Sequence, residues 1–396
     1  MPHSTELQAL YARLAATAAA RERRREQPYQ EVAELAALGF GALRVPTALG
    51  GGGLSVAQLT EQLLQLASAD ANFVQVFRAH FIFVESLLLA EPSSNRDLWL
   101  RRIAAGAVVG GAHTERNPVN TDHFATQLHS EGGERWLSGE KYYATGSLFA
   151  DWVATLAEDE DQRLTLLVVP RDAEGLSLPD DWDGFGQRLT ASGSARFERV
   201  KVGAENALPI FESLAPYATS LAQHFHLIAL AGIARNAHAD AVDYVRARTR
   251  YFSHGSGQLP RDDAQVQALV GELSSAAYSS AVIVRDIGER LDTMVAWLAQ
   301  PGANADALNG LEHDVFRAQH LLVQRVLEAA TRLFDVGGAS ALAESRNWDR
   351  HWRNARTLAS HNPVDFRLRA IGNYELTGEV ALRAWFSGVD LRQRAF

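Results

Sequence analysis

The sequence predicts a mainly α-helical protein with a central β domain, because its hydrophobic patterns change twice along the chain. Apolar residues recur at three- and four-residue steps up to about residue 103, and again from about residue 208. Between these regions the helical periodicity fades, and short β-rich runs are separated by glycine and proline turns. Grouped strands argue against a doubly wound sheet, in which strands and helices alternate. We expect a helical domain over residues 1–107, an antiparallel β domain over 108–205 and a helical bundle over 206–396.

Two apolar stripes predict the N-terminal helices. The first stripe consists of Leu7, Leu10, Leu14 and Ala18. The second runs from Val56 to Leu66 behind Ser55, whose hydroxyl suits a helix N-cap. The glycines at 50–53 indicate a loop between helices. The basic run from Arg21 to Arg25 indicates a solvated face near the end of the first helix.

Simple sequence patterns also predict the strands and the later helices. Residues of high β propensity gather in three runs, Trp152–Leu156, Leu164–Val169 and Ala195–Val202. Farther along, Ala264–Ala296 is long and largely uninterrupted, as expected for a helix of a bundle. A second helix of the bundle carries the apolar stripe Leu322, Val326, Ala329 and Leu333.

Composition narrows the classes of function. The chain has 396 residues, with 38 basic and 47 acidic side chains, so its net charge is −9 and nucleic-acid binding is disfavoured. It has no cysteine, which excludes disulfides, thiolate metal sites and a cysteine nucleophile. We find no long uncharged apolar run and no signal-peptide pattern, so we expect a cytoplasmic protein that does not span a membrane.

The common short motifs are missing as well. No dinucleotide-binding glycine pattern, no phosphate-binding loop and no nucleophile elbow occurs. We expect no metal site either, since His224 and His226 stand two residues apart and so lie on different faces of a helix.

Five segments, in their order and spacing, resemble the acyl-CoA dehydrogenase superfamily. They are Gly39–Pro46 with Leu49–Ser55, Ala112–Glu115, Gly139–Gly146 with Ala150-Asp151, the last β segment from Gly184–Arg188 through Ser192 to Val202, and Asp335–Gly338. The resemblance implies an N-terminal helical domain, an antiparallel β-barrel or sandwich, and a C-terminal four-helix bundle. It also implies a bound flavin, whose ring needs a flat slot and hydrogen bonds to its polar edge.

The resemblance assigns candidate flavin contacts residue by residue. They are Thr114, Glu115, Asn117, Tyr143, Thr145, Arg248, Arg250, Gly337 and Gly338. The two threonines supply small hydroxyls for the ring, and one of the two arginines is a candidate for the flavin phosphate. The alternatives are ordinary strand threonines and surface charges. Bulky Arg116 and Asn117 replace the small residues of the dehydrogenases, which favours FMN and leaves FAD as the second choice.

The proton acceptor of the dehydrogenases is missing from both of its usual positions. Acyl-CoA dehydrogenation needs a carboxylate over the substrate. The matching C-terminal stretch, Arg353–Pro363, contains no Glu. The alternative position, in Gln223–Leu227 before Ala231-Gly232, has no carboxylate either. Ordinary acyl-CoA dehydrogenation is therefore disfavoured.

The segments Arg356–Pro363 and Arg78–Phe81 instead resemble the flavin-dependent monooxygenases of the same superfamily. Those enzymes take reduced flavin from a separate reductase, react it with oxygen and hold a C4a-(hydro)peroxide. The resemblance places Thr145 near the flavin N5, makes His361 a proton donor and lets His80 position the substrate. The alternatives are a helix-capping role for His361 and a core position for His80, and His226 matches no known role.

We therefore expect a two-component monooxygenase that uses reduced FMN, O2 and an NAD(P)H-dependent flavin reductase on a small apolar, organosulfur-type substrate. The resemblance also implies a homotetramer. The alternative is an FAD dehydrogenase of the same fold with a non-standard base. A third hypothesis is a helical scaffold that keeps the fold without flavin, and failure of reduced flavin to raise its melting temperature would favour it.

Overall fold

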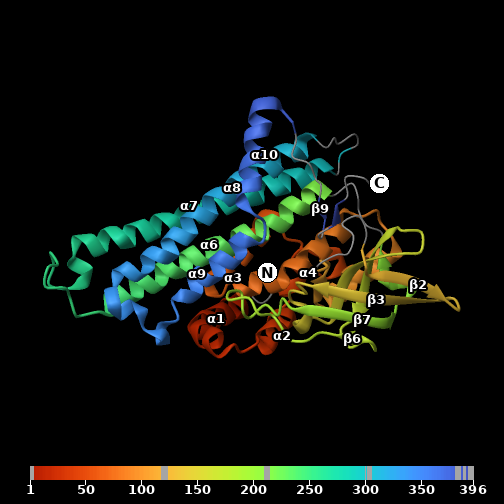
Figure 1. Ribbon diagram of the computed structural model, residues 1–396, viewed down its shortest axis with the longest axis horizontal. Helices are drawn as coiled ribbons and strands as arrows, with labels where there is room; N and C mark the ends of the chain where they lie inside the picture. The colour runs from red at the N-terminus through yellow and green to blue at the C-terminus, as the bar shows by residue number, and fades with distance from the viewer. Residues whose placement is uncertain are drawn as a thin grey trace.

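A computed structural model describes residues 4–116, 124–208, 215–298, 300, 306–379, 385–386 and 389–390. Helices come first, a sheet follows, and long helices complete the chain (Figure 1). The predicted order of helices, strands and helices is therefore confirmed.

The N-terminal helices share one continuous apolar core with the long C-terminal helices. The N-terminal helices are α1 (Ser4–Arg24), α2 (Tyr29–Ala37), α3 (Val56–Ala69), α4 (Asn72–Leu89) and α5 (Ser94–Ala104). The predicted stripe of α1 is buried, and Ser55 caps α3 by accepting a hydrogen bond from the Gln58 backbone N–H at 3.2 Å. Short turns of 3-10 helix, η1 (Phe40–Ala42) and η2 (Thr47–Leu49), precede the glycine loop.

One sequence-based expectation for α1 is wrong. Arg21 is only 2% exposed, and its guanidinium donates to Asp70 across 2.9 Å. The basic run is therefore not a uniformly solvated face, because the Asp70 carboxylate compensates this one buried charge.

The central sheet is mixed rather than purely antiparallel. Its strands are β1 (Val109–Ala112), β2 (Gln127–Glu131), β3 (Glu134–Tyr142), β4 (Trp152–Glu158), β5 (Leu164–Pro170), β6 (Leu176–Ser177), β7 (Ser194–Lys201) and β8 (Ala207–Leu208). The order is β6-β7-β3-β2-β4-β5-β8, and β1 pairs with β4 in parallel. The prediction of an antiparallel domain fails at β1, since this strand leaves the helical domain beside β4 and in the same direction. Strand β8 pairs with β5 and lies just beyond the expected boundary at residue 205.

The C-terminal region is a bundle of long helices. They are α6 (Ala215–Ala247), α7 (Ala264–Leu298), α8 (Asp306–Arg332), α9 (Asp349–Ser360) and α10 (Val364–Thr377). Between α8 and α9 lie the 3-10 turns η7 (Leu333–Val336), η8 (Gly338–Leu342) and η9 (Glu344–Arg346), and β9 (Trp385–Phe386) pairs with β10 (Val389–Asp390) near the C-terminus. Figure 1 shows α6, α7 and α8 running side by side away from the sheet.

Helix α4 connects the sheet to the bundle. It contacts both β1 and α6. Two glycines permit the close approach of the β domain, because a Cβ atom at Gly111 would collide with Ala79 and one at Gly146 with the Val76 carbonyl. Helix α4 is long and apolar enough to cross a membrane, but 67% of it is buried inside the protein, as in a core helix.

Candidate active site

Arg78 lies on α4, the helix that contacts both β1 of the sheet and α6 of the bundle. Its Nε donates to the carbonyl of Ala222 on α6 at 3.0 Å. Within the described part of the chain, its two terminal nitrogens have no protein partner. Burial lowers the pKa of Arg78 to about 10, so the side chain remains a cation at neutral pH.

Three histidines surround this cation. His113 follows β1, His226 lies on α6, and His361 caps the C-terminal end of α9. The ring centroids of His226 and His361 are 4.2 Å apart. Burial is the largest cause that lowers the pKa of each of these three rings; the charge of Arg78 lowers all three further, and at His113 the charge of Lys141 also contributes.

These histidines are neutral at physiological pH. Burial lowers the pKa of His113 to about 4 and that of His361 to about 3, and it lowers the pKa of His226 well below its usual range. The His361 side chain nevertheless presents an exposed surface while many protein atoms surround it.

Several polar ring atoms at this site lack partners. His226 is 2% exposed, and neither of its ring nitrogens has a hydrogen-bond partner in the described residues. The Nδ1 atom of His113 is also buried without a partner. Buried polar groups are normally paired in native proteins, so unpaired atoms on facing elements indicate a ligand site.

Amides, rather than carboxylates, adjoin the histidine pair. Asn362 donates to the Gln223 side chain at 2.7 Å, and Gln319 donates to the Asn362 carbonyl at 2.9 Å. Among the described residues, no Asp or Glu contributes to the pKa shift of His226 or His361. The region in which dehydrogenases of this fold keep their base therefore holds neutral groups here.

A chain of hydroxyl groups lies on the sheet side of the site. Thr145 and Ser192 are 2.7 Å apart, Ser192 and Thr190 are 2.7 Å apart, and Thr190 donates to the Gln187 carbonyl at 2.8 Å. A carbonyl can only accept, so the Thr190 hydroxyl donates its one hydrogen bond to the Gln187 carbonyl. Thr190 must therefore accept the hydrogen bond that it shares with Ser192. Ser192 then has no proton left for Thr145. Thr145 therefore donates to Ser192, and toward a ligand its hydroxyl oxygen can act only as an acceptor.

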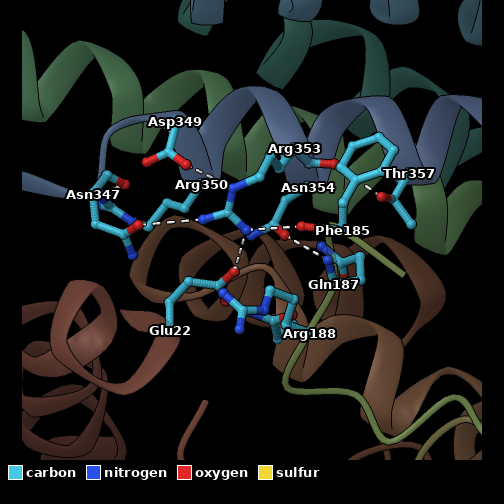
Figure 2. A network of polar contacts seen from close by, with 12 residues as sticks. Glu22, Phe185, Gln187, Arg188, Asn347, Asp349, Arg350, Arg353, Asn354 and Thr357 are labelled. Carbon is cyan, nitrogen blue, oxygen red and sulfur yellow. Dashed lines mark hydrogen bonds and ion pairs between the residues drawn. The ribbon is translucent and has the colours of Figure 1, made fainter. Parts of the chain in front are cut away.

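Helix α9 anchors this hydroxyl chain. The side-chain oxygen of Asn354 accepts from the Gln187 backbone N–H at 2.6 Å. Figure 2 shows Arg353 of α9 reaching both the Glu22 carboxylate and the Phe185 carbonyl, each at 2.9 Å. Because His361 caps the same helix, these contacts fix the position of His361 relative to the hydroxyl chain.

Two predicted site residues are engaged elsewhere. His80 is fully buried, with Nδ1 accepting from the Val109 N–H at 3.1 Å, so its Nε2 carries the proton and donates to the Gly41 carbonyl at 2.8 Å. No ring atom of His80 is left for a substrate. The Glu115 carboxylate pairs with buried Lys141 at 2.8 Å and accepts from the backbone at Ala125 and Thr126. The geometry therefore favours structural roles for the side chains of both residues.

The other predicted ring contacts lie along the edge of the sheet near Thr145. Thr114 accepts at its carbonyl from the Tyr142 N–H at 2.8 Å, and its hydroxyl has no partner in the described residues. Tyr143 is 51% exposed and has a left-handed φ of 62°. Asn117 lies outside the described residues.

The predicted phosphate contacts lie at the opposite end of the bundle. Arg248 donates to the Gly337 carbonyl at 2.8 Å, Gly338 packs beside it, and Arg250 is exposed. From His226 to the end of α6 the helical rise amounts to roughly 30 Å. Within one chain, these residues therefore cannot contact a flavin that lies beside Thr145.

Sequence analysis assigned no role in the site to Arg78, His113, Ser192 or His226. Arg78 stands in the same segment as His80, and His113 lies inside the Ala112–Glu115 segment. Ser192 belongs to the last β segment, but its role depends on Thr145, which is distant in sequence. These residues stand in or near the family motifs in the sequence, but a position in the sequence does not show which way a side chain points.

Comparisons with known proteins agree with this architecture. Residues 6–107 match the family model for the acyl-CoA dehydrogenase N-terminal domain, and residues 225–366 match the C-terminal domain. The probable FMNH2-dependent monooxygenase SfnC of Pseudomonas putida is 29% identical over 96% of this chain and 95% of its own length. Dibenzothiophene monooxygenase of Rhodococcus qingshengii is 26% identical over 94% of this chain and 92% of its own length.

Two solved structures are similar over almost the whole chain. Methanesulfinate monooxygenase MsuC of Pseudomonas fluorescens has a TM-score of 0.86 and 30% identity, covering 95% of this chain and 97% of its own. FMN-bound TdsC of a Paenibacillus species has a TM-score of 0.85 and 25% identity, covering 95% and 98%. The fold and the site define a protein of the acyl-CoA dehydrogenase type. The chain belongs to the acyl-CoA dehydrogenase superfamily, in its flavin-dependent monooxygenase branch.

Proposed function

We propose that this protein is a two-component monooxygenase that uses reduced FMN and O2 to add one oxygen atom to a small organosulfur compound. The observation that carries the proposal is the His226–His361 pair, which stands among amides where a dehydrogenase needs a carboxylate. The relatives whose names mention FMNH2, methanesulfinate and dibenzothiophene support the cofactor and the substrate class.

The residues present fit a flavin ring. The acceptor lone pair of Thr145 suits the N5–H of reduced flavin, and the free hydroxyl of Thr114 can pair with a polar ring edge. Tyr143, which is half exposed beside Thr145, would lie along the rest of the ring. Bound reduced FMN supplies the electrons that activate dioxygen, and the protein supplies position, a dry site and proton control.

His361 is the residue that we assign to proton control. A neutral imidazole can donate one proton and accept another, and His361 lies against the unpaired ring of His226. A carboxylate at this position would repel negative charge that develops on reduced oxygen in a low-dielectric site. The choice of histidine over Glu thus favours oxygen chemistry over removal of a proton alpha to a thioester.

We also propose that the enzyme is a soluble, cytoplasmic homotetramer served by an NAD(P)H-dependent flavin reductase. The Arg248–Gly337 cluster cannot reach the flavin of its own chain, so a second copy would bring it to the phosphate. Exposed apolar side chains on the outer faces of the bundle would suit such an interface. They are Tyr278, Leu321, Phe366 and Leu376.

The competing hypothesis is an FAD dehydrogenase of the same fold. Purified protein separates the two. The monooxygenase is expected to be nearly colourless and to consume O2 with an organosulfur substrate only when a reductase, NAD(P)H and FMN are added. Tight yellow FAD that is bleached by an acyl-CoA under anaerobic conditions would contradict the proposal.

A further inference from the structure

Arg78 is a cation without a counter-ion in the described part of the chain. Three other arginines with little exposed surface each have a carboxylate partner: Arg21 pairs with Asp70 at 2.9 Å, Arg44 with Glu85 at 2.7 Å and Arg350 with Asp240 at 2.9 Å. Arg78 has only a backbone carbonyl, at Ala222. A guanidinium has several N–H donors in a fork that matches oxyanions, and Arg78 is tied to α6 one helical turn before His226.

We propose that the substrate carries a negatively charged oxyanion head, as in a sulfinate or sulfonate, and that Arg78 binds this head with a hydrogen bond from His226. The inference rests on the proposed function and narrows its substrate class from apolar to anionic compounds. Arg78 and His226 are thus specificity residues for the same site, and neither is part of the proton control that we assign to His361.

His226 fits this task because both of its ring nitrogens are buried and unpaired. Its neutral ring can donate one N–H to an oxygen of the head. It stands one helical turn beyond Ala222, the residue to which Arg78 is tied, so the two donors face the same region of α6. The contact between His226 and His361 then places the sulfur of the substrate beside the proton-handling residue.

Two anions could in principle meet Arg78, namely the substrate and the reduced flavin ring. We favour the substrate as the partner of Arg78, because Arg78 and His226 are both held at α6. Arg78 is tied to α6, and His226 lies on α6, whereas Thr145 and its hydroxyl chain belong to the β domain. The helical bundle therefore supplies the partners of the cation, whereas the β domain supplies the hydroxyl chain that fits the flavin N5.

The chemistry balances for a sulfinate. R–SO2⁻, O2 and the reduced flavin FMNH2 give R–SO3⁻, H2O and oxidised FMN. The O–O bond breaks and an S–O bond forms, so one oxygen atom goes to sulfur and the other leaves as water with the two hydrogens of the flavin. The flavin and the sulfur each lose two electrons, which together reduce the oxygen.

The test compares Arg78→Gln and Arg78→Lys with wild-type enzyme, using methanesulfinate as the anionic probe and dimethyl sulfide as the neutral one. Arg96→Gln is a matched control, because Arg96 is another half-buried arginine whose Nε donates to a helix carbonyl, at Leu87. We expect Arg78→Gln to weaken methanesulfinate binding in calorimetry about 100-fold. The Lys variant should recover part of this loss, and the control variant should bind normally.

Three outcomes would overturn the inference. The first is wild-type enzyme that binds dimethyl sulfide but not methanesulfinate. The second is an Arg78→Gln variant whose affinity for methanesulfinate equals that of wild type. The third is an Arg78→Gln variant that loses affinity for FMN but keeps its affinity for methanesulfinate. The last result would assign Arg78 to the flavin. Because binding is measured without turnover, a failure of oxygenation in wild-type enzyme would count against the proposed function and leave the Arg78 result interpretable. A melting curve for each variant confirms that it is folded.

Discussion

The imidazole rings of His226 and His361 lie with their centroids 4.2 Å apart, one on α6 and the other at the end of α9. Burial and the neighbouring charge of Arg78 lower the pKa of both rings, and His361 lowers the pKa of His226 further. The pair is therefore neutral before a substrate enters. An anion bound beside Arg78 would oppose this effect and raise the pKa of His361, which would couple substrate binding to proton donation.

Removing the His361 ring should separate flavin oxidation from oxygen transfer. His361→Ala is expected to reduce product formation at least about 100-fold, the usual size of a general acid or base contribution, while FMN binds with its normal affinity. Reduced flavin should still be oxidised, with hydrogen peroxide as the product. A peroxide assay beside product analysis checks this, with exposed His129 on β2 changed to Ala as the control. Full turnover by His361→Ala would remove its assigned role.

The direction of the hydroxyl chain predicts how the site distinguishes the two redox states of FMN. In wild-type protein Thr145 donates to Ser192 and can only accept from the flavin. Ser192→Ala frees the Thr145 proton for N5 of oxidised flavin, so its affinity for oxidised FMN should rise roughly fivefold, the value of one ordinary hydrogen bond. Fluorescence titration with oxidised FMN measures this. Thr145→Val, which removes the hydroxyl altogether, should show no such gain, and unchanged affinity in Ser192→Ala would refute the assigned direction.

His80 should matter for stability rather than for catalysis. Its ring bonds the Gly41 carbonyl and the Val109 N–H, so His80→Leu leaves two buried backbone groups unpaired. We expect a loss of about 3 kcal/mol in the free energy of unfolding. At a temperature where the variant is folded, kcat/KM should stay close to that of wild type. Urea unfolding and steady-state kinetics test the two statements separately, and a large fall in kcat at unchanged stability would restore the catalytic role predicted from the sequence.

The buried histidines also predict acid sensitivity. Burial lowers the pKa of His80 and of His351 to about 4, whereas both titrate near 6.5 when exposed. The unfolded chain therefore binds more protons than the native one between these values. Stability is fully present above pH 6.5 and falls as the pH drops toward 4, by up to about 1 kcal/mol per pH unit for each such group. Urea midpoints at a series of pH values measure the slope, which should be smaller in His80→Leu; a midpoint that rises on acidification would contradict the prediction.

Much of the fold follows from local sequence, because helix stripes, turn residues and the Ser55 cap act over short distances. The site was less predictable. Thr145 and His361 were proposed through their motifs, but Arg78 and His80 stand two residues apart on α4 and so point in roughly opposite directions. Which of the two faces the site depends on how α4 packs between β1 and α6.

The same reasoning explains the other departures from expectation. Arg21 was predicted to be solvated, and only the tertiary fold brings Asp70 to it. His226 had no assigned role, since its partner His361 comes from a different helix. The Glu115 carboxylate is used by Lys141, which lies on another strand. In each case the deciding contact joins residues that are distant in sequence.

The central claim is that the histidine-lined site transfers oxygen from O2 to sulfur. Its most direct test is turnover under ¹⁸O2 with reduced FMN supplied by a reductase, followed by mass spectrometry of the product formed from methanesulfinate. We predict one ¹⁸O atom in each methanesulfonate formed, and loss of this product in His361→Ala. Product oxygen that derives from water, or flavin oxidation that never yields a labelled product from methanesulfinate or any neutral organosulfur compound, would contradict the account.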